Sequence, residues 1–272
     1  MFWKLKKVIK NPIDAAMYTI RKKFKSNNVT NDDEIAISFD RQVYYGNPLK
    51  SGIAKSILHT GYWEYFTSQK FKNSISKFDH VVDVGAAGGY FTLLAAKRAY
   101  KVTCFEPIPI FKRQLDNNIK HNNYRNCTTH ELALLNENTT HVLSQPGVKS
   151  RIVVDNINSS DNQDCLTIRC VKFDDFHNEN KLGKVDLIKI DIEGCELLAL
   201  RGMISTLKTY KPKLLIELHP SLFEQFGYNL DDLLRFLYDL DYKIFPVDVG
   251  WKTFNAILQG HCDNNIVIYA SG

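Results

Sequence analysis

Two apolar runs of the sequence each carry a pair of ionisable side chains, two residues apart, at the downstream end. Lys189 and Asp191 form one pair, and Glu217 and His219 form the other. Side chains alternate along a strand, so the two members of each pair point the same way. If the strands are neighbours, the four groups converge. Such a set can orient a hydroxyl group and remove its proton, and the ordinary histidine pKa of about 6.5 suits a base at neutral pH.

Other interpretations of these groups stay open. His219 could be a strand-end histidine that only satisfies a backbone carbonyl, and Lys189 could pair with a neighbouring carboxylate for structural reasons alone. Asp191, Glu193 and Glu217 could bind a divalent cation, because carboxylate oxygens are suited to magnesium. Ligand binding and capping of a helix N-terminus are the more ordinary roles of such carboxylates, and we expect no metal.

A glycine-rich turn, Gly85 to Gly89, follows another apolar run. A dinucleotide-binding turn reads GxGxxG, but Ala87 and Tyr90 occupy its second and third glycine positions. No GxxxxGK[ST] phosphate loop is present either. The turn therefore favours a ligand with an adenosine but no phosphates, and S-adenosylmethionine is such a ligand. A purely structural turn is the alternative.

Two acidic residues support this prediction. The amino-acid end of the cofactor needs a partner near Asp83 and Gly85, and its ribose diol needs a carboxylate at the end of the next strand. Glu106 follows Asp83 by 23 residues, close to the spacing expected of a ribose-binding acid.

Strands and helices alternate from about residue 80 onward. This alternation predicts an α/β fold with a mostly parallel sheet and helices on both faces. The expected strands are 81–84, 101–105, 126–132, 185–190, 213–218, 242–247 and 266–269, and the expected helices are 90–99, 108–122, 195–207 and 230–239. Residues 136–180 interrupt the alternation and are predicted to be a β insertion near the edge of the sheet. We expect residues 1–75 to form a helical and lid-like N-terminal region, and residues 76–272 to form the cofactor-binding domain.

The chain resembles the FkbM-type S-adenosylmethionine-dependent methyltransferases. The matching stretches are VVDVGAAGGYFT (81–92), FEPIPIFKRQLDNNIKHNN (105–123), VDLIKIDIEGCELLALRGM (185–203) and KPKLLIELHP (211–220). The strings FEPxP and KIDIEGxE are specific, whereas the glycine turn is not. Upstream, the segment that ends in Glu64 resembles a short acidic motif of the family. One departure is Ala87, where the family usually has Asn, so a contact by that side chain is lost while the backbone turn should persist.

The resemblance implies a Rossmann-like class I methyltransferase fold with a seven-stranded sheet, and O-methylation of a hydroxyl group. The cofactor contacts that we expect are Glu64, Asp83, Gly85, Ala86, Ala87, Tyr90, Phe91, Glu106, Pro107, Leu132, Ala133, Asp191 and Glu193. The expected base is His219 or Asp191, held in place by Glu217 and Lys189. We expect a sugar acceptor in a surface glycan or a lipid-linked polysaccharide. A polyketide or peptide methyltransferase, and a cofactor-binding protein without catalysis, are the alternatives.

Positive charge is concentrated at the start of the chain. Residues 1–25 contain eight lysines and arginines against one acid, Asp14, and their apolar residues recur every three or four positions. This pattern predicts two short amphipathic helices that either lie on an anionic membrane or pack on the body of the protein. The rest of the chain is nearly neutral, so nucleic acid is not an expected partner. With neither a membrane-spanning run nor a secretory signal, we expect a cytoplasmic protein that can work at the inner face of the membrane.

If residues 1–25 bind anionic lipid, the protein should co-sediment with phosphatidylserine vesicles, and this binding should fall steeply as salt is added, because salt screens the attraction. A variant that lacks residues 1–25 should lose vesicle binding and keep cofactor binding. Equal co-sedimentation of the two proteins would assign the segment to packing or to an oligomer contact instead.

Overall fold

The computed structural model describes residues 35–144, 151–152, 165–247, 249–250, 254 and 265–272. The two helices predicted within residues 1–25 lie outside the described residues, as do parts of the predicted insertion. Among the described helices, none has the length and apolar character that a membrane span requires.

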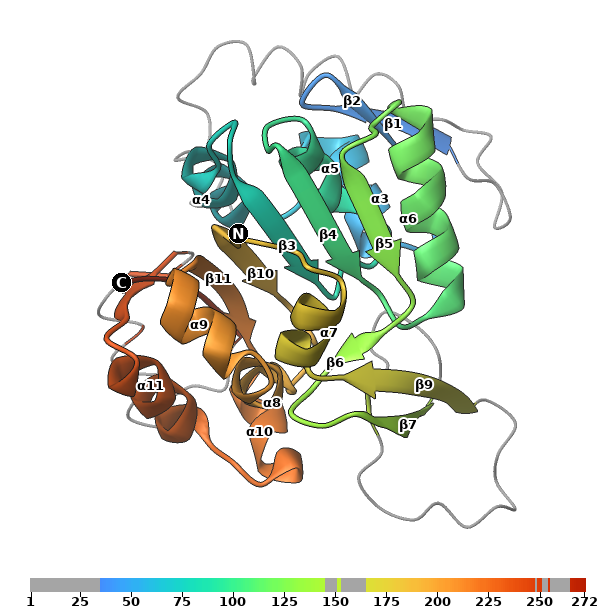
Figure 1. Ribbon diagram of the computed structural model, residues 1–272. Helices are drawn as coiled ribbons and strands as arrows, with labels where there is room; N and C mark the ends of the chain where they lie inside the picture. The colour runs from blue at the N-terminus through green and yellow to red at the C-terminus, as the bar shows by residue number, and fades with distance from the viewer. Residues whose placement is uncertain (1–34, 145–150, 153–164, 248, 251–253, 255–264) are drawn as a thin grey trace.

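The centre of the fold is a seven-stranded sheet with the order β12-β13-β11-β10-β3-β4-β5 (Figure 1). Its strands are β3 (His80–Val84), β4 (Lys101–Phe105), β5 (Cys127–His130), β10 (Leu187–Ile190), β11 (Lys213–Leu218), β12 (Lys243–Pro246) and β13 (Ile266–Ser271). The five strands from β11 to β5 are parallel, whereas β13 pairs antiparallel with both β11 and β12. The mostly parallel sheet predicted from the alternation of apolar runs is confirmed.

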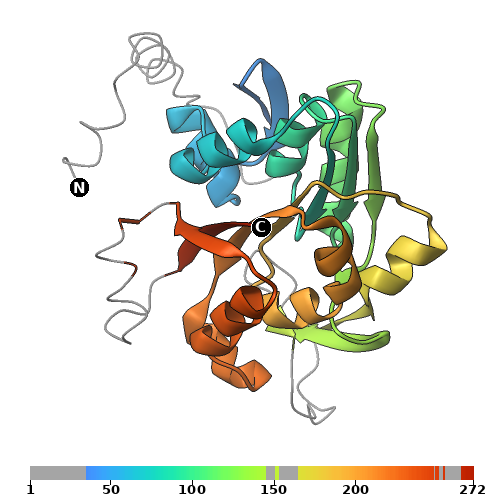
Figure 2. The ribbon, with the colours of Figure 1, turned by 60° about the vertical axis from the view of Figure 1, so that its left-hand side comes forward.

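Helices cover both faces of this sheet (Figure 2). Alternate residues of β3 face opposite layers: Val82 and Val84 belong to one apolar cluster, and Val81 belongs to the other. The first cluster includes side chains of α7 (Phe173–Glu179), α8 (Glu196–Arg201), α9 (Ile204–Tyr210), α10 (Pro220–Phe223) and α11 (Leu230–Asp239). The second includes side chains of α3 (Gly52–Thr60), α4 (Tyr65–Ser74), α5 (Tyr90–Ala96) and α6 (Pro109–His121). Because both faces are buried, the inner strands are mostly apolar, and Asp83 in β3 and Lys189 in β10 are buried exceptions.

The hairpin of β1 (Ile35–Phe39) and β2 (Gln42–Gly46) packs on the second layer. The carboxylate of Asp40, in the hairpin turn, lies 2.6 Å from the Arg98 guanidinium, and the side-chain oxygen of Asn118 accepts the Tyr45 N–H at 2.7 Å. These contacts place Tyr44, on the buried face of β2, beside the glycine turn. The sequence predicted a helical and lid-like region here but not these individual elements, because residues 36–75 carry no clear period. The domain division at residue 75 stays a prediction.

The predicted insertion forms a sheet of its own. The strands β7 (Thr139–Ser144), β8 (Arg151–Ile152) and β9 (Cys165–Val171) lie within residues 136–180, and β6 (Ala133–Leu134) joins them from just before that range, in the order β6-β9-β7-β8. The predicted insertion is not entirely β, because α7 also falls within it. This sheet lies below the carboxyl ends of β4 and β5 in Figure 1, rather than continuing the edge of the central sheet. It therefore overhangs the end of the sheet where parallel α/β proteins bind their ligands.

The helix predicted over 195–207 is broken into α8 and α9. The break falls at Gly202, where a Cβ atom would lie 1.9 Å from the carbonyl oxygen of Leu135. Two segments distant in sequence thus meet backbone to backbone, which only glycine permits. The 3₁₀ turn η1 (Glu224–Phe226) follows α10.

His80, at the start of β3, generates a prediction about stability. Its Nδ1–H donates to the Lys184 carbonyl at 3.2 Å, and its Nε2 accepts from the Thr103 hydroxyl at 2.8 Å. Burial, together with the positive charge of Lys101, lowers the pKa of His80 to about 4. The folded state thus favours the neutral imidazole. The free energy of unfolding should fall as the pH drops from about 6.5 to about 4, by no more than ~3 kcal/mol from this group.

Urea unfolding at a series of pH values tests this expectation. Replacing His80 by Gln should flatten the pH dependence over that window, whereas replacing the exposed His121 by Gln should leave it as in the natural protein. Parallel curves for all three proteins would contradict the assignment to His80.

Candidate active site

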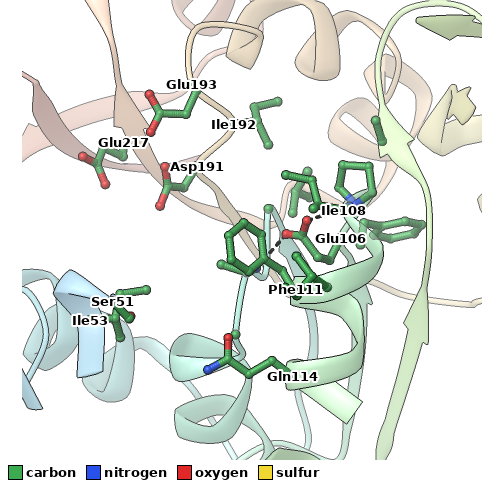
Figure 3. A pocket seen from close by; sticks show the side chains of 18 of the residues that line it. Ser51, Ile53, Glu106, Ile108, Phe111, Gln114, Asp191, Ile192, Glu193 and Glu217 are labelled. Atoms are coloured by element: carbon green, nitrogen blue, oxygen red, sulfur yellow. Dashed lines mark hydrogen bonds between the residues drawn. The ribbon is translucent and has the colours of Figure 1, made fainter. Parts of the chain in front are cut away.

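A cavity of about 920 Å³ opens at the carboxyl ends of β3, β4, β10 and β11. Figure 3 shows its two different ends. Asp191, Glu193 and Glu217 present carboxylates at one end, and Glu106 lies with Ile108 and Phe111 at the other. The cavity is therefore acidic at one end and largely apolar around a single carboxylate at the other. Its position is the one that the strand-end rule predicts.

The glycine turn between β3 and α5 forms the floor between these ends. Gly85 has φ +78°, and a Cβ atom there would lie 1.9 Å from the carbonyl oxygen of Asp191. No other residue type fits such an approach. Ala87 also adopts a left-handed conformation, with φ +46°. The turn therefore persists with Ala87 in place of the family's usual Asn, as expected.

Glu106 follows β4 and is held by two backbone donors. Its carboxylate accepts the Ala87 N–H at 2.8 Å and the Ile108 N–H at 2.9 Å. Burial raises its pKa to about 7, against the opposing effect of these hydrogen bonds. Each oxygen retains acceptor capacity, and Pro107, Leu132 and Ala133 line the cavity nearby. This wall fits a ribose diol at Glu106, with a flat aromatic base among the apolar side chains.

Asp83 lies behind the glycine turn and is fully buried. Its Oδ2 accepts from the Thr92 hydroxyl at 2.6 Å, while its Oδ1 has no hydrogen-bond partner among the described residues. Burial raises its pKa, although the Lys189 charge acts in the opposite direction. The side chain does not line the cavity, so the direct cofactor contact expected of Asp83 is not supported by the geometry.

Three further cofactor contacts expected from the sequence are not supported by the geometry. Ala86, Tyr90 and Phe91 face the core below the turn and do not line the cavity. The Tyr90 hydroxyl lies 3.0 Å from Ser68 Oγ, and the Phe91 ring lies beneath Lys189 Nζ, 4.6 Å from it. Because α5 begins at Tyr90, its first turn packs against the sheet instead of pointing at the ligand. Glu64 does line the cavity, as expected.

The acidic end brings together the groups that the sequence predicted to converge. Since β10 and β11 are adjacent and Ile190 pairs with Ile216, Asp191 and Glu217 follow in register. One donor atom from each of Asp191, Glu217 and His219 lies within 4.8 Å of the other two. All three line the cavity. Convergence is thus a property of the structure, and their catalytic roles stay predictions.

Lys189 supports this cluster from below. Its Nζ lies 3.2 Å from Asp191 Oδ2, and the side chain is 5% exposed and does not line the cavity. Burial alone would lower its pKa, but the charges of Asp191 and Asp83 outweigh burial and raise it. Asp191, Glu217 and His219 could geometrically hold a metal ion, yet this ammonium already supplies a cation to Asp191. Lys189 therefore lies beneath the cavity in contact with Asp191, and its role in holding the arrangement stays a prediction.

The electrostatic environment of His219 differs from the one expected from the sequence. Its Nδ1 lies 2.9 Å from Oε1 of Glu196, a fully buried residue that the sequence had not singled out. Burial by itself would lower the pKa of His219, but the hydrogen bond and charge of Glu196, with Asp191 and Glu217, raise it to about 9. Burial and the charges of Asp191 and Glu64 raise the pKa of Glu217 to about 8. The ordinary histidine pKa therefore does not apply here.

Much of the remaining lining was not predicted. These residues come from the hairpin and α3 with the segments that follow them, from the start of α6, from the insertion sheet and from a loop before β13. They include Tyr44, Asn47, Lys50, Ser51, Ile53, Trp63, Ile108, Phe111, Arg113, Gln114, Leu143, Ile168 and Asn265. The start of α6 could have been found, because it directly follows the FEPxP string. Of the aromatic residues Tyr62, Trp63, Tyr65 and Phe66, which flank Glu64, Trp63 alone lines the cavity.

The fold and the site define a class I methyltransferase. The family profile described as the methyltransferase FkbM domain matches residues 83–244. The chain therefore belongs to the FkbM methyltransferase family, and its cofactor is S-adenosylmethionine, as the turn and Glu106 predicted. A search of curated proteins gave no match.

A solved structure from the same family shares the fold. A methyltransferase FkbM from Methylobacillus flagellatus KT is 18% identical with a TM-score of 0.50, and the match covers 80% of this chain and 52% of that one. The chain thus spans about half the length of that relative. A putative methyltransferase from Streptococcus mutans in complex with SAH is 12% identical (TM-score 0.43; 76% and 94% covered), and M. jannaschii TYW2 in complex with AdoMet is also 12% identical (TM-score 0.46; 89% and 86% covered).

The ribose assignment of Glu106 can be tested by calorimetry. Glu106→Ala should weaken S-adenosylmethionine binding by roughly 1.5–3 kcal/mol, because hydrogen bonds to a charged acceptor are lost. The protein should not bind NAD. The exposed Glu131, which does not line the cavity, provides a matched Glu131→Ala control with unchanged affinity. Binding at full strength in Glu106→Ala would refute the assignment.

Proposed function

We propose that the protein is an O-methyltransferase that acts on a hydroxyl group of a sugar, in a surface glycan or a lipid-linked polysaccharide. The observation that carries this proposal is the division of the cavity. One end fits an adenosine, and the other gathers Asp191, Glu217 and His219 within 4.8 Å of one another. These three residues support the proposal because they offer a base and hydrogen-bond acceptors to a hydroxyl group.

The chain's own residues would bind and orient both reactants. Glu106 would hold the ribose, and the backbone of the Gly85 turn would lie along the amino-acid portion. When bound, the cofactor supplies an electrophilic methyl group on a sulfonium. Holding the acceptor oxygen in line with that carbon lowers the barrier by several kcal/mol through positioning alone.

Proton removal falls to His219. With the cofactor bound, the acceptor oxygen would receive the methyl group and give up its hydroxyl proton to Nε2 of His219. Only the neutral imidazole can accept it. A pKa near 9 keeps most of the imidazole protonated at neutral pH. The sulfonium of a bound cofactor would bring a positive charge into the cavity and disfavour the imidazolium. The pKa of His219 should therefore fall when the cofactor is bound. Asp191 is the alternative base.

Hydrogen-bonding capacity at the acidic end favours a polyhydroxyl acceptor. Asp191, Glu193 and Glu217 are partly exposed to the cavity, with side-chain exposures of 27%, 31% and 18%. Asn265 and Ser51 also line it. Several acceptors in one place suit a ring that carries several hydroxyl groups. A polyketide or peptide acceptor is the alternative for an enzyme. The apolar side chains of Ile53 and Trp63, which also line the cavity, favour it.

Release of S-adenosylhomocysteine with candidate acceptors tests the proposal. Lipid-linked oligosaccharides and polysaccharide fractions should accept a methyl group, and mass spectrometry should find the gain of one CH₂ on a sugar oxygen. Methyl transfer only to a peptide or a polyketide would show that the acceptor is not a sugar. Cofactor binding without release for any acceptor fraction would favour the non-catalytic alternative.

The base assignment makes a kinetic prediction. His219→Ala should lower the turnover number about 10²–10⁴-fold and barely change cofactor affinity, because Nε2 acts on the acceptor. In the natural protein the rate should rise with pH through one ionisation, since deprotonation creates the base, and the variant should lose that step. Near-normal turnover would transfer the role to Asp191. Near-normal turnover in an Asp191→Asn variant as well would mean that positioning alone carries the reaction.

A further inference from the structure

Glu196, in the first turn of α8, is a buried carboxylate without an obvious structural use. The residue is fully buried, and only one of its oxygens is satisfied. Oε1 accepts the Gly194 N–H at 3.1 Å and lies 2.9 Å from His219 Nδ1. Oε2 is buried and has no hydrogen-bond partner among the described residues. A neutral side chain could satisfy the single Gly194 N–H, so this hydrogen bond does not explain the charge.

The contact with His219 explains the charge. An ionised carboxylate accepts only, so the shared proton belongs to Nδ1–H, which donates to Oε1. The neutral imidazole must then carry its lone pair on Nε2. That atom lies 3.8 Å from both Glu193 Oε2 and Glu217 Oε1, on the cavity side of the ring. The geometry thus keeps the proton away from the cavity and directs the basic nitrogen toward it.

We propose that Glu196 is a positioning residue that fixes the Nδ1–H tautomer of His219 and aims Nε2 at the acceptor hydroxyl. The proposal rests on His219 being the base of the proposed function. In an imidazole with the opposite tautomer, Nε2 carries a proton and cannot accept another. The carboxylate also stabilises the imidazolium that proton removal creates.

The other charges around His219 cannot replace this contact. Asp191, Glu193 and Glu217 face the ring from the ends of β10 and β11, and the ammonium of Lys189 lies beside Asp191. None of these groups reaches Nδ1. Removing the Glu196 charge should therefore have two effects. The pKa of His219 should fall, and the imidazole should no longer be held in the Nδ1–H tautomer.

The natural protein provides the first test. In ¹⁵N-histidine-labelled protein, the His219 imidazole can be recognised as the resonance missing from His219→Ala. Its neutral form should carry the proton on Nδ1, and its pKa should lie above the ordinary histidine value. A neutral form protonated on Nε2 would overturn the proposal, and this measurement requires no change at position 196.

Glu196→Gln provides the second test. The amide keeps the size of the side chain, but its NH₂ group can donate to Nδ1 and select the wrong tautomer. We expect a roughly 10–10²-fold lower turnover number, less than for loss of the base itself, and a rate step shifted to lower pH. Glu224→Gln is the matched control, because Glu224 is an exposed carboxylate in the turn that follows α10. It should behave as the natural protein.

The two hypotheses fail in different ways. A Glu196→Gln protein that binds cofactor normally and retains the natural pKa of His219 and the natural pH profile would overturn the positioning role. Normal turnover in His219→Ala, with a shifted His219 pKa in Glu196→Gln, would refute His219 as the base and still confirm that Glu196 holds its ring.

Discussion

The close approach of the β3–α5 turn to the end of β10 is the constraint on which the rest of the site depends. Gly85 touches the Asp191 carbonyl so closely that a Cβ atom would lie 1.9 Å from it. This contact fixes the cofactor-binding turn relative to the strand that carries Asp191 and Lys189. Since β11 pairs with β10 in register, the same contact also fixes the positions of Glu217 and His219. The two ends of the cavity are thus held in fixed relation by one backbone contact.

Charge balance within the site follows from this arrangement. Carboxylates crowd the carboxyl ends of β10 and β11, and the pKa of Glu217 is raised to about 8 partly because Asp191 and Glu64 repel its charge. Two cationic groups compensate from below: Lys189 for Asp191, and His219 for Glu196. Apolar replacements of buried ion pairs often stabilise proteins as well or better. The position of these two pairs beneath the cavity therefore favours a chemical role over a contribution to stability.

The sequence predicted the parts of the fold that depend on local pattern. The strand over 213–218 and the helix over 230–239 have the expected bounds, because an apolar run and an amphipathic period decide them. The convergence of Asp191, Glu217 and His219 followed from strand-end position and periodicity. The break at Gly202 and the role of Glu196 could not be predicted. The break depends on the Leu135 carbonyl, and the role of Glu196 depends on a histidine 23 residues away. From the sequence alone, an acid in the first turn of a helix usually indicates only a favourable interaction with the helix dipole.

Three of the nine non-glycine residues with positive φ in the described part of the chain lie at the cavity. Glu64, Ala87 and Glu193 adopt left-handed conformations with φ between +43° and +50°, and all three line the cavity. Each such residue costs roughly 1–2 kcal/mol, so the surrounding structure must hold it in place. At Ala87 the strain points the N–H at Glu106, and at Glu193 it turns the chain between Asp191 and α8. The turn at Glu193 brings Glu196 back beneath His219. The backbone strain after β10 and the orientation of the imidazole at the end of β11 are therefore physically linked.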